Sequence, residues 1–422
     1  MLEPKTNTSP ADQKLSPWAE QILKDTLPLA PKDGSLQEKA EFLEMLTKKL
    51  QAVKDFERMN PRTMESVVLK RGYTEVAVLK GHPNYVTCLQ ALPDGRIVSG
   101  SEYDKTLRVW TTNTDGQWSS EELSGHTDWI RCLQAIPDGR IVSGSNDCTL
   151  RVWTKNANGT WSSETLSGHT CCVFCLQVLP DGRIVSGSGS KDGALRVWTR
   201  SETGEWSSEG LSDGDHYWIR CLQVLPDGSI VSGGRSVWTR GGQGEWSSKK
   251  LSGHTYEVTC LQALPDGRIV SGSNDCTLRV WTKNAEGQWD SEKISGHIDP
   301  VHCLQALPNG SIVSGGNDGT LLIWTKNANG TWSSEQLSGH TQPVMCLQAL
   351  PDGRVVSGSF DKTLRVWTKN VNGTWSSEKL AEDIYDFSRL QVLPTGEIIS
   401  GSADGTIRIW DGTPVKIKRG VS

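Results

Sequence analysis

The segment Gly139–Lys155 reads GRIVSGSNDCTLRVWTK, and the same string recurs without change at Gly267–Lys283. Its Trp belongs to a series whose members mostly stand 43 residues apart. The series is Trp110, Trp153, Trp198, Trp238, Trp281, Trp324, Trp367 and Trp410. Self-similarity at a fixed period of about 20 to 50 residues indicates a repeat architecture. The fold must therefore be built from eight copies of one unit.

Each unit contains four short apolar runs separated by turn residues. In the second unit, WIRCLQAI (Trp129–Ile136) is followed by a Pro-Asp-Gly turn, RIVSGS, an Asp-containing turn, TLRVW, a KNANG loop and TWSSETL. Gly permits positive φ in such turns, and Asp and Asn bond to nearby backbone there. Four β-type runs in a unit of this length predict the four-stranded blades of a β-propeller.

At these residues the chain resembles the WD40 repeat proteins. A Gly-His pair precedes the first run of most units, and the resemblance extends over residues 74–411. The pairs begin at Gly81, Gly125, Gly168, Gly253, Gly296 and Gly339. The Trp-Asp dipeptide of that family stands only at Trp410-Asp411, and the other units end in Trp-Thr. Since the blade interior does not need this Asp, the departure leaves the expected fold unchanged.

The number of runs predicts the number of blades. Each of the eight units supplies three inner runs, but only seven units also supply a Trp-bearing fourth run. TEVAVL (Thr74–Leu79) precedes the first Gly-His pair and can supply the missing outer strand. We expect an all-β, eight-bladed WD40-type propeller closed by this N-terminal strand, which leaves no open edge in the ring. Seven blades, with the fourth unit looped out, is the alternative.

The remaining segments differ in composition from the repeats. Ser35-Leu-Gln-Glu38 is a capping box, and apolar residues follow it at helical spacing. The expected organisation is therefore a helical N-terminal segment over residues 1–72, a propeller over 73–413 and a C-terminal tail over 414–422.

The fourth unit is shorter than the others. Its segment SIVSGGRSVWTR (Ser229–Arg240) keeps Ser232 and Trp238 but lacks the long turn and its Asp. Gly233-Gly234 could form a two-residue hairpin turn, because both residues tolerate positive φ. The fourth unit is therefore expected to be a trimmed blade.

Composition excludes several classes of function. A net charge of −5 lacks the basic surplus typical of nucleic-acid binding. No run approaches the roughly 18 apolar residues of a membrane span, and the N-terminus lacks the pattern of a signal peptide. Seven Cys occupy one repeating position inside apolar runs, which indicates buried thiols in a reducing compartment, so we expect a cytoplasmic protein. The sequence indicates no cofactor and no oligomeric state.

Resemblance to the WD40 family also implies a hydrogen-bonded set of four side chains in each blade. One set is His126, Ser143, Asp147 and Trp153, and another is His254, Ser271, Asp275 and Trp281. Ser, His and Asp together are the constituents of a catalytic triad, but a triad occurs once and this set recurs. The set is therefore interpreted as structural, with no metal bound by its histidines, and the protein as a non-enzyme.

The same resemblance places three residues of each blade around the top opening of the propeller. These positions predict a partner-binding face that contains Tyr85, Tyr103, Trp129, Arg131, Phe174, Lys191, Trp218, Arg220 and Phe360. Aromatic and Arg side chains dominate the binding energy of protein interfaces. The leading hypothesis is a protein-interaction scaffold that presents this face to a peptide or protein. The alternative is the substrate-receptor subunit of a ubiquitin-ligase complex that recognises acidic or phosphorylated peptides.

Overall fold

A computed structural model of the chain describes residues 73–412, except 190–194, 213, 215–217, 234, 371, 383–386 and 394–395. In this part every regular element is a β-strand. The predicted helices of residues 1–72 and the predicted tail of residues 414–422 lie outside the described residues.

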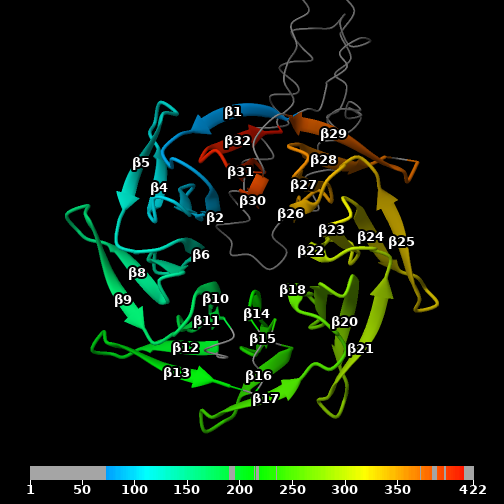
Figure 1. The fold of residues 1–422 in the computed structure, drawn as a ribbon, viewed down its shortest axis with the longest axis horizontal. Helices are drawn as coiled ribbons and strands as arrows, with labels where there is room; N and C mark the ends of the chain where they lie inside the picture. The colour runs from blue at the N-terminus through cyan, green and yellow to red at the C-terminus, as the bar shows by residue number, and fades with distance from the viewer. Residues whose placement is uncertain are drawn as a thin grey trace, which may run out of the picture. The chain divides into compact units, whose positions relative to one another are not determined.

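Thirty-two strands form eight antiparallel sheets of four strands, arranged as blades around a ring (Figure 1). Blade 1 comprises β2 (Val86–Ala91), β3 (Ile97–Ser101), β4 (Leu107–Thr112) and β5 (Trp118–Leu123), and blade 2 comprises β6 (Ile130–Ala135), β7 (Ile141–Ser145), β8 (Thr149–Lys155) and β9 (Trp161–Ser167). Blade 3 comprises β10 (Val173–Val178), β11 (Ile184–Ser188), β12 (Leu195–Arg200) and β13 (Trp206–Leu211). Blade 4 comprises β14 (Leu222–Val224), β15 (Ile230–Ser232), β16 (Ser236–Arg240) and β17 (Trp246–Lys250).

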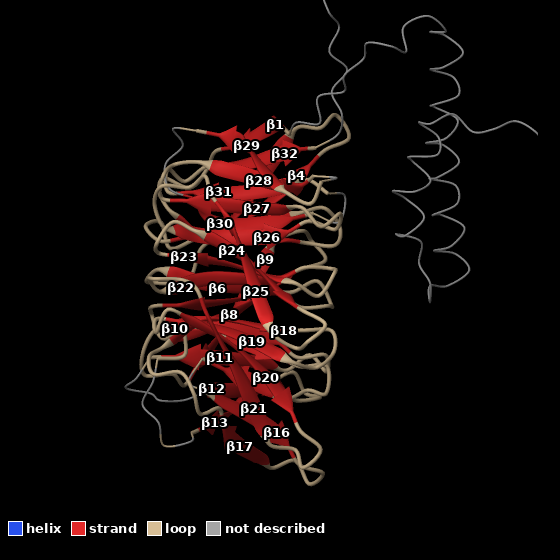
Figure 2. Cartoon of the chain, turned by 90° about the vertical axis from the view of Figure 1, so that its right-hand side faces the viewer, coloured by secondary structure: helices blue, strands red, loops and turns tan. Residues whose placement is uncertain are grey.

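Blades 5 to 7 follow the same order. Blade 5 comprises β18 (Val258–Ala263), β19 (Ile269–Ser273), β20 (Thr277–Lys283) and β21 (Trp289–Ser295). Blade 6 comprises β22 (Val301–Ala306), β23 (Ile312–Gly316), β24 (Leu321–Lys326) and β25 (Trp332–Leu337). Blade 7 comprises β26 (Val344–Ala349), β27 (Val355–Ser359), β28 (Leu364–Lys369) and β29 (Trp375–Ala381). The turns between strands gather on two opposite sides of the ring (Figure 2).

Blade 8 joins the two ends of the described chain. It consists of β30 (Phe387–Val392), β31 (Ile398–Ser402), β32 (Ile407–Asp411) and, on its outer side, β1 (Thr74–Leu79). β1 runs antiparallel to β32, from Thr74 opposite Asp411 to Leu79 opposite Ile407. The predicted eight blades and the predicted closing strand are confirmed, and the seven-blade alternative is wrong.

Blade 4 is complete but trimmed, with three-residue strands at β14 and β15. Ser232 pairs with Ser236, so the hairpin turn spans the three residues between them, and the two-residue turn expected from Gly233-Gly234 is wrong. The left-handed residue is Arg235, with φ of 68°, and its N–H donates to Ser232 O at 3.0 Å. A three-residue hairpin commonly ends in such a left-handed residue, which adapts the turn to the twist of the strands.

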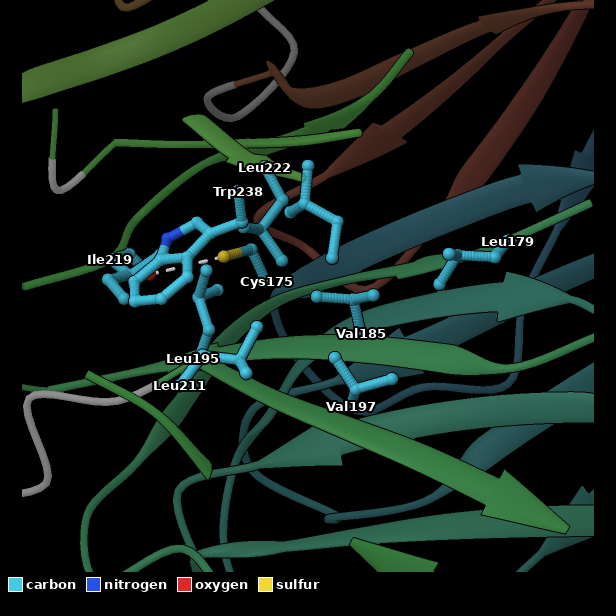
Figure 3. Packing of buried hydrophobic residues seen from close by; sticks show 10 residues of the cluster. Cys175, Leu179, Val185, Leu195, Val197, Leu211, Ile219, Leu222 and Trp238 are labelled. Atoms are coloured by element: carbon cyan, nitrogen blue, oxygen red, sulfur yellow. Dashed lines mark hydrogen bonds between the residues drawn. The ribbon is translucent and has the colours of Figure 1, made fainter. Parts of the chain in front are cut away.

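The hydrophobic core lies between neighbouring blades. Residues of β10–β13 pack against residues of β14–β16, and the buried Trp238 of blade 4 lies beside Cys175 and Ile219 (Figure 3). The Cys175 thiol donates to Ile219 O at 3.1 Å across this boundary. Corresponding clusters fill the boundaries of the other blades, so each blade is stabilised mainly by its neighbours.

Glutamine side chains link the innermost strands across the blade boundaries. The Leu-Gln dipeptide occurs in all eight units. Gln90 Oε1 accepts the N–H of Ala135 at 2.7 Å, and Gln134 Oε1 accepts the N–H of Val178 at 2.8 Å. An inner strand is the edge of its sheet, where backbone groups lack a neighbouring strand. These amides therefore satisfy edge N–H groups and hold adjacent blades in register.

The repeating cysteines are thiols packed at the same boundaries. All eleven Cys of the chain lie in the described part, and all are free. Burial raises the pKa of Cys88, Cys260 and Cys346 to about 12. Since the thiolate is the reactive form, these side chains act as small apolar residues.

Candidate partner-binding face

Blades 1, 2, 5, 6 and 7 each contain a buried network of Trp, Ser, His and Asp. In blade 2 the Trp153 indole donates to Ser143 Oγ at 2.9 Å, and Ser143 Oγ lies 2.8 Å from His126 Nε2. His126 Nδ1 lies 2.7 Å from Asp147 Oδ2, which fixes the imidazole tautomer with its proton on Nδ1. Blade 5 repeats this arrangement with Trp281, Ser271, His254 and Asp275, each contact measuring 2.8 Å.

The network also holds the turn that follows the second strand. Asp147 accepts the N–H of Thr127 and both the N–H and the hydroxyl of Thr149. Burial alone would raise the pKa of Asp147, but the hydrogen bonds from His126 and Thr149 hold it well below its usual range. The carboxylate therefore joins two top-side loops, and its contacts are fully used within the blade.

Mild acid is expected to destabilise the propeller through these histidines. Burial lowers the pKa of His254, His297 and His340 below 6.5, although a neighbouring Asp opposes this effect in each. As the pH falls through 6.5, the unfolded chain binds protons before the folded chain does, so stability is lost on acidification. Calorimetric unfolding at pH 7.5 and pH 5.5 should give a lower Tm at pH 5.5, with proton uptake on unfolding near pH 6. An equal or higher Tm at pH 5.5 would contradict this expectation.

β-Bulges orient two side chains of the predicted face. The register of the first two strands shifts between Ile130 and Cys132 in blade 2, and between Val173 and Cys175 in blade 3. Arg131 and Phe174 are the extra residues of these bulges. A bulge releases its residue from regular pairing and redirects the side chain. The bulges lie where the first strand begins, which is also the side of the Asp turns.

Tyr103, Trp129 and Arg131 form the first of two clusters on this face. The rings of Tyr103 and Trp129 lie 6.4 Å apart across the boundary between blades 1 and 2. The Arg131 guanidinium lies 4.8 Å from the centre of the Trp129 ring, and Arg131 Nε donates to Asn146 Oδ1 at 2.8 Å. Among the described residues, no carboxylate pairs with Arg131. Its terminal nitrogens therefore keep their donors for a partner.

The second cluster consists of Phe174, Trp218 and Arg220. The rings of Phe174 and Trp218 are stacked at 5.4 Å with an interplanar angle of 16°. The Arg220 guanidinium lies 4.7 Å from the centre of the Trp218 ring, and Arg220 Nε lies 3.4 Å from Glu257 Oε2 of blade 5. A stacked guanidinium is held in one orientation while its edge remains available for hydrogen bonds. Glu257 shares this edge, so an acidic ligand must compete with it.

The other predicted residues are more scattered. Tyr85 is half-buried, and its N–H bonds to Asn84 Oδ1 and Ala403 O. Phe360 is 42% exposed and has no ring contact with the two clusters. Lys191 lies outside the described residues. The structure thus unites six of the nine predicted residues into two clusters.

Asn146 and Glu257 were missing from the predicted face. Both orient an arginine, and both belong to positions that the repeat places around the opening. Asn146 lies in the same blade as Arg131, whereas the pairing of Glu257 with Arg220 depends on which blades meet, which one repeat unit considered alone does not reveal.

The described residues of blade 4 do not form the Trp–Ser–His–Asp network. Ser232 Oγ donates instead to Ser236 O at 3.3 Å. Trp238 is still only 5% exposed, but among the described residues its indole N–H has no bond to Ser232. Among the described residues, packing therefore holds this Trp, in a cluster that includes Ile219, the residue between Trp218 and Arg220.

The described part of the chain contains no group of three or more His, Cys, Asp or Glu side chains placed to hold a metal ion. No helix in it is long and apolar enough to cross a membrane.

Comparison with known proteins agrees with this architecture. The family model "WD domain, G-beta repeat" matches residues 73–111, 118–154, 161–199, 246–282, 290–325, 332–368 and 381–411. No matched stretch covers β14–β16, in keeping with the trimmed turn of blade 4. None of the curated proteins compared with the chain matches it.

Among solved structures, the chain is similar to the crystal structure of the WD40 beta propeller domain of Doa1. The two are 23% identical with a TM-score of 0.55, over 81% of this chain and 97% of that one. At this identity the likeness supports the fold alone. With the repeat match over most of the ring and eight four-stranded blades, the chain belongs to the WD40 repeat family, whose propellers are generally protein-interaction scaffolds and usually not catalytic.

Proposed function

We propose that the propeller binds a peptide or protein loop on the sector of its top face formed by blades 1 to 4. The observation that carries this proposal is the pair of Arg–Trp stacks, the half-buried Arg131 on Trp129 and the exposed Arg220 on Trp218. Tyr103 is 57% exposed and Trp218 39% exposed beside them. Exposed aromatic rings next to Arg are the residue types that dominate interface energies.

The stacks favour a partner with acidic groups. Arg131 is oriented by Trp129 and Asn146, and its remaining donors fit the two oxygens of a carboxylate or phosphate. Phe174 and Trp218 supply an aromatic surface beside the second Arg. A segment that pairs acidic and apolar side chains would contact both clusters.

A double substitution tests this face. Trp129→Ala with Arg220→Ala is expected to weaken partner binding at least roughly thirtyfold, because the loss of even one hot-spot residue costs about 2 kcal/mol or more. Affinity purification with mass spectrometry, followed by binding measurements on the recovered partner, gives the readout. Tyr256→Ala is a matched control, since it removes a 65% exposed ring outside the two clusters. Unchanged partner recovery by the double variant would reject this site.

The second candidate function is a ubiquitin-ligase substrate receptor, which the acid-binding geometry of Arg131 also suits. That function needs an adaptor contact, which we assign to residues 1–72. The chain and its 73–422 truncation should then recover the same acidic or phosphorylated partner, and only the full chain should recover a ligase adaptor. Recovery of no adaptor by the full chain would leave the scaffold function alone.

A further inference from the structure

A repeated ionic contact joins the outer strand of one blade to the third and outer strands of the next blade. At the boundary of blades 1 and 2, Lys155 Nζ lies 2.9 and 3.0 Å from the two oxygens of Glu121, and the Trp161 indole donates to the same carboxylate. At the boundary of blades 5 and 6, Lys326 and Trp332 donate to Glu292 in the same way, at 2.8 to 3.0 Å. A Lys and an indole N–H thus bind one carboxylate of the preceding blade.

At the boundary of blades 4 and 5, a positively charged residue stands where the other two boundaries have the carboxylate. Lys249 faces Val237 across its strand pair, as Glu121 faces Val109, so Lys249 occupies the position of the carboxylate. Lys283 and Trp289 pair with each other as Lys155 and Trp161 do. The Lys and the indole are therefore present here, but their acidic partner is replaced by a second Lys.

A pocket of about 210 Å³ opens at this boundary. Its lining residues are Val237, Thr239, Lys249, Lys283, Gly287 and Trp289. Small-molecule pockets usually measure about 300 to 1,000 Å³, so this one suits a single side chain better than a cofactor. Val237 gives it an apolar floor, and the two lysines are exposed at its rim.

The two lysines have no acidic partner among the described residues. Lys249 Nζ donates to Gly287 O at 2.7 Å, and neither Lys249 nor Lys283 forms an ion pair. Both side chains border Gly287, with Lys249 Nζ at 3.6 Å and Lys283 Cε at 3.9 Å from the place that a Cβ would take. Glu286 lies on the same turn, but its N–H bonds to Asn284, and its carboxylate pairs with neither lysine. Two adjacent ammonium groups without a counter-charge favour an anion.

We propose that the boundary of blades 4 and 5 binds a Glu or Asp side chain from an acidic segment of a partner protein. The carboxylate takes the place that Glu121 and Glu292 occupy at their own boundaries, where it accepts hydrogen bonds from the Lys283 ammonium and the Trp289 indole N–H. Lys249 adds a third donor, because an ammonium group has donors beyond the one directed at Gly287. The turns that carry this pocket join the third and fourth strands, at the opposite end of the strands from the Arg–Trp stacks. The site is thus separate from the proposed top face.

Titration of the full chain, labelled with ¹⁵N at its Trp residues, with a hexaglutamate peptide tests the proposal. The Trp289 indole resonance, assigned from a Trp289→Phe variant, should shift and saturate, and those of Trp161 and Trp332 should remain in place. Lys249→Glu should weaken binding at least about tenfold, because the new carboxylate occupies the site from within the chain and repels the peptide. Its Tm should be unchanged or higher, which separates loss of binding from loss of folding.

Glu121→Lys is the matched gain-of-binding variant. It places the same charges at the boundary of blades 1 and 2, so the Trp161 resonance should now respond to the peptide. Equal affinity of the Lys249→Glu variant and the unaltered chain, or an unmoved Trp289 resonance, overturns the proposal. A Trp289 shift produced by inorganic phosphate but not by hexaglutamate overturns it as well. The Trp129→Ala and Arg220→Ala substitutions should leave this titration unaffected, so the two surfaces can fail independently.

Discussion

A chain that begins at Lys80 is expected to lose about 4 kcal/mol or more of stability, because it lacks β1 and the buried Leu79. Without β1, Ile407 and Ile409 of β32 lose the strand that covers them, and β32 becomes an open edge that can pair with another molecule. Calorimetry should show a Tm lower by roughly 5–10 °C, and light scattering should show association.

The matched control is a chain that begins at Tyr73 and so retains β1. It should keep the Tm of the full chain. If the Lys80 chain instead remained monomeric with an unchanged Tm, β1 would not be the strand that closes the ring.

Replacement of Trp281 by Ala is expected to cost about 3–5 kcal/mol, the usual range for a fully buried Trp. Trp281 is 1% exposed, fills the boundary between blades 4 and 5, and donates to Ser271. Urea unfolding followed by circular dichroism measures the loss. Trp238→Ala in blade 4 should cost roughly 1 kcal/mol less, since Trp238 makes no bond to Ser232.

Phenylalanine substitutions separate packing from hydrogen bonding at these two positions. Trp281→Phe removes the indole N–H and leaves Ser271 with one partner fewer, whereas Trp238→Phe removes no such bond. A smaller loss for Trp281→Phe than for Trp238→Phe would show that the network contributes no stability beyond the packing of its Trp.

Much of the fold could be predicted because the repeat carries it. The spacing of the Trp series and the turn residues predicted eight blades, and TEVAVL was recognisable as the missing outer strand. The blade 4 turn was predicted incorrectly, because two adjacent Gly suggest a tight turn. The strand register instead requires three residues, with the left-handed conformation at Arg235.

The candidate face could be predicted only as a set of positions. Family resemblance placed Trp129, Arg131, Trp218 and Arg220 around the opening, but the two clusters also depend on contacts between blades. Those contacts join residues about 25 to 45 positions apart, beyond the reach of local patterns. The exchange of an acidic residue for Lys249 could be seen in the sequence, because WSSK stands where five of the other outer runs have WSSE. Only the pairing of neighbouring blades gives that exchange a consequence.

The closing strand β1 also determines the order in which the ring can fold during translation. β1 leaves the ribosome before any other strand that the structure describes, yet its partner β32 is more than 300 residues further along the chain. Synthesis at about 5–20 residues per second separates the two by tens of seconds at the slower rates. During that interval β1 has no sheet to join, while the Gln links already allow the early blades to assemble against one another. The ring can therefore be completed only after translation has nearly ended.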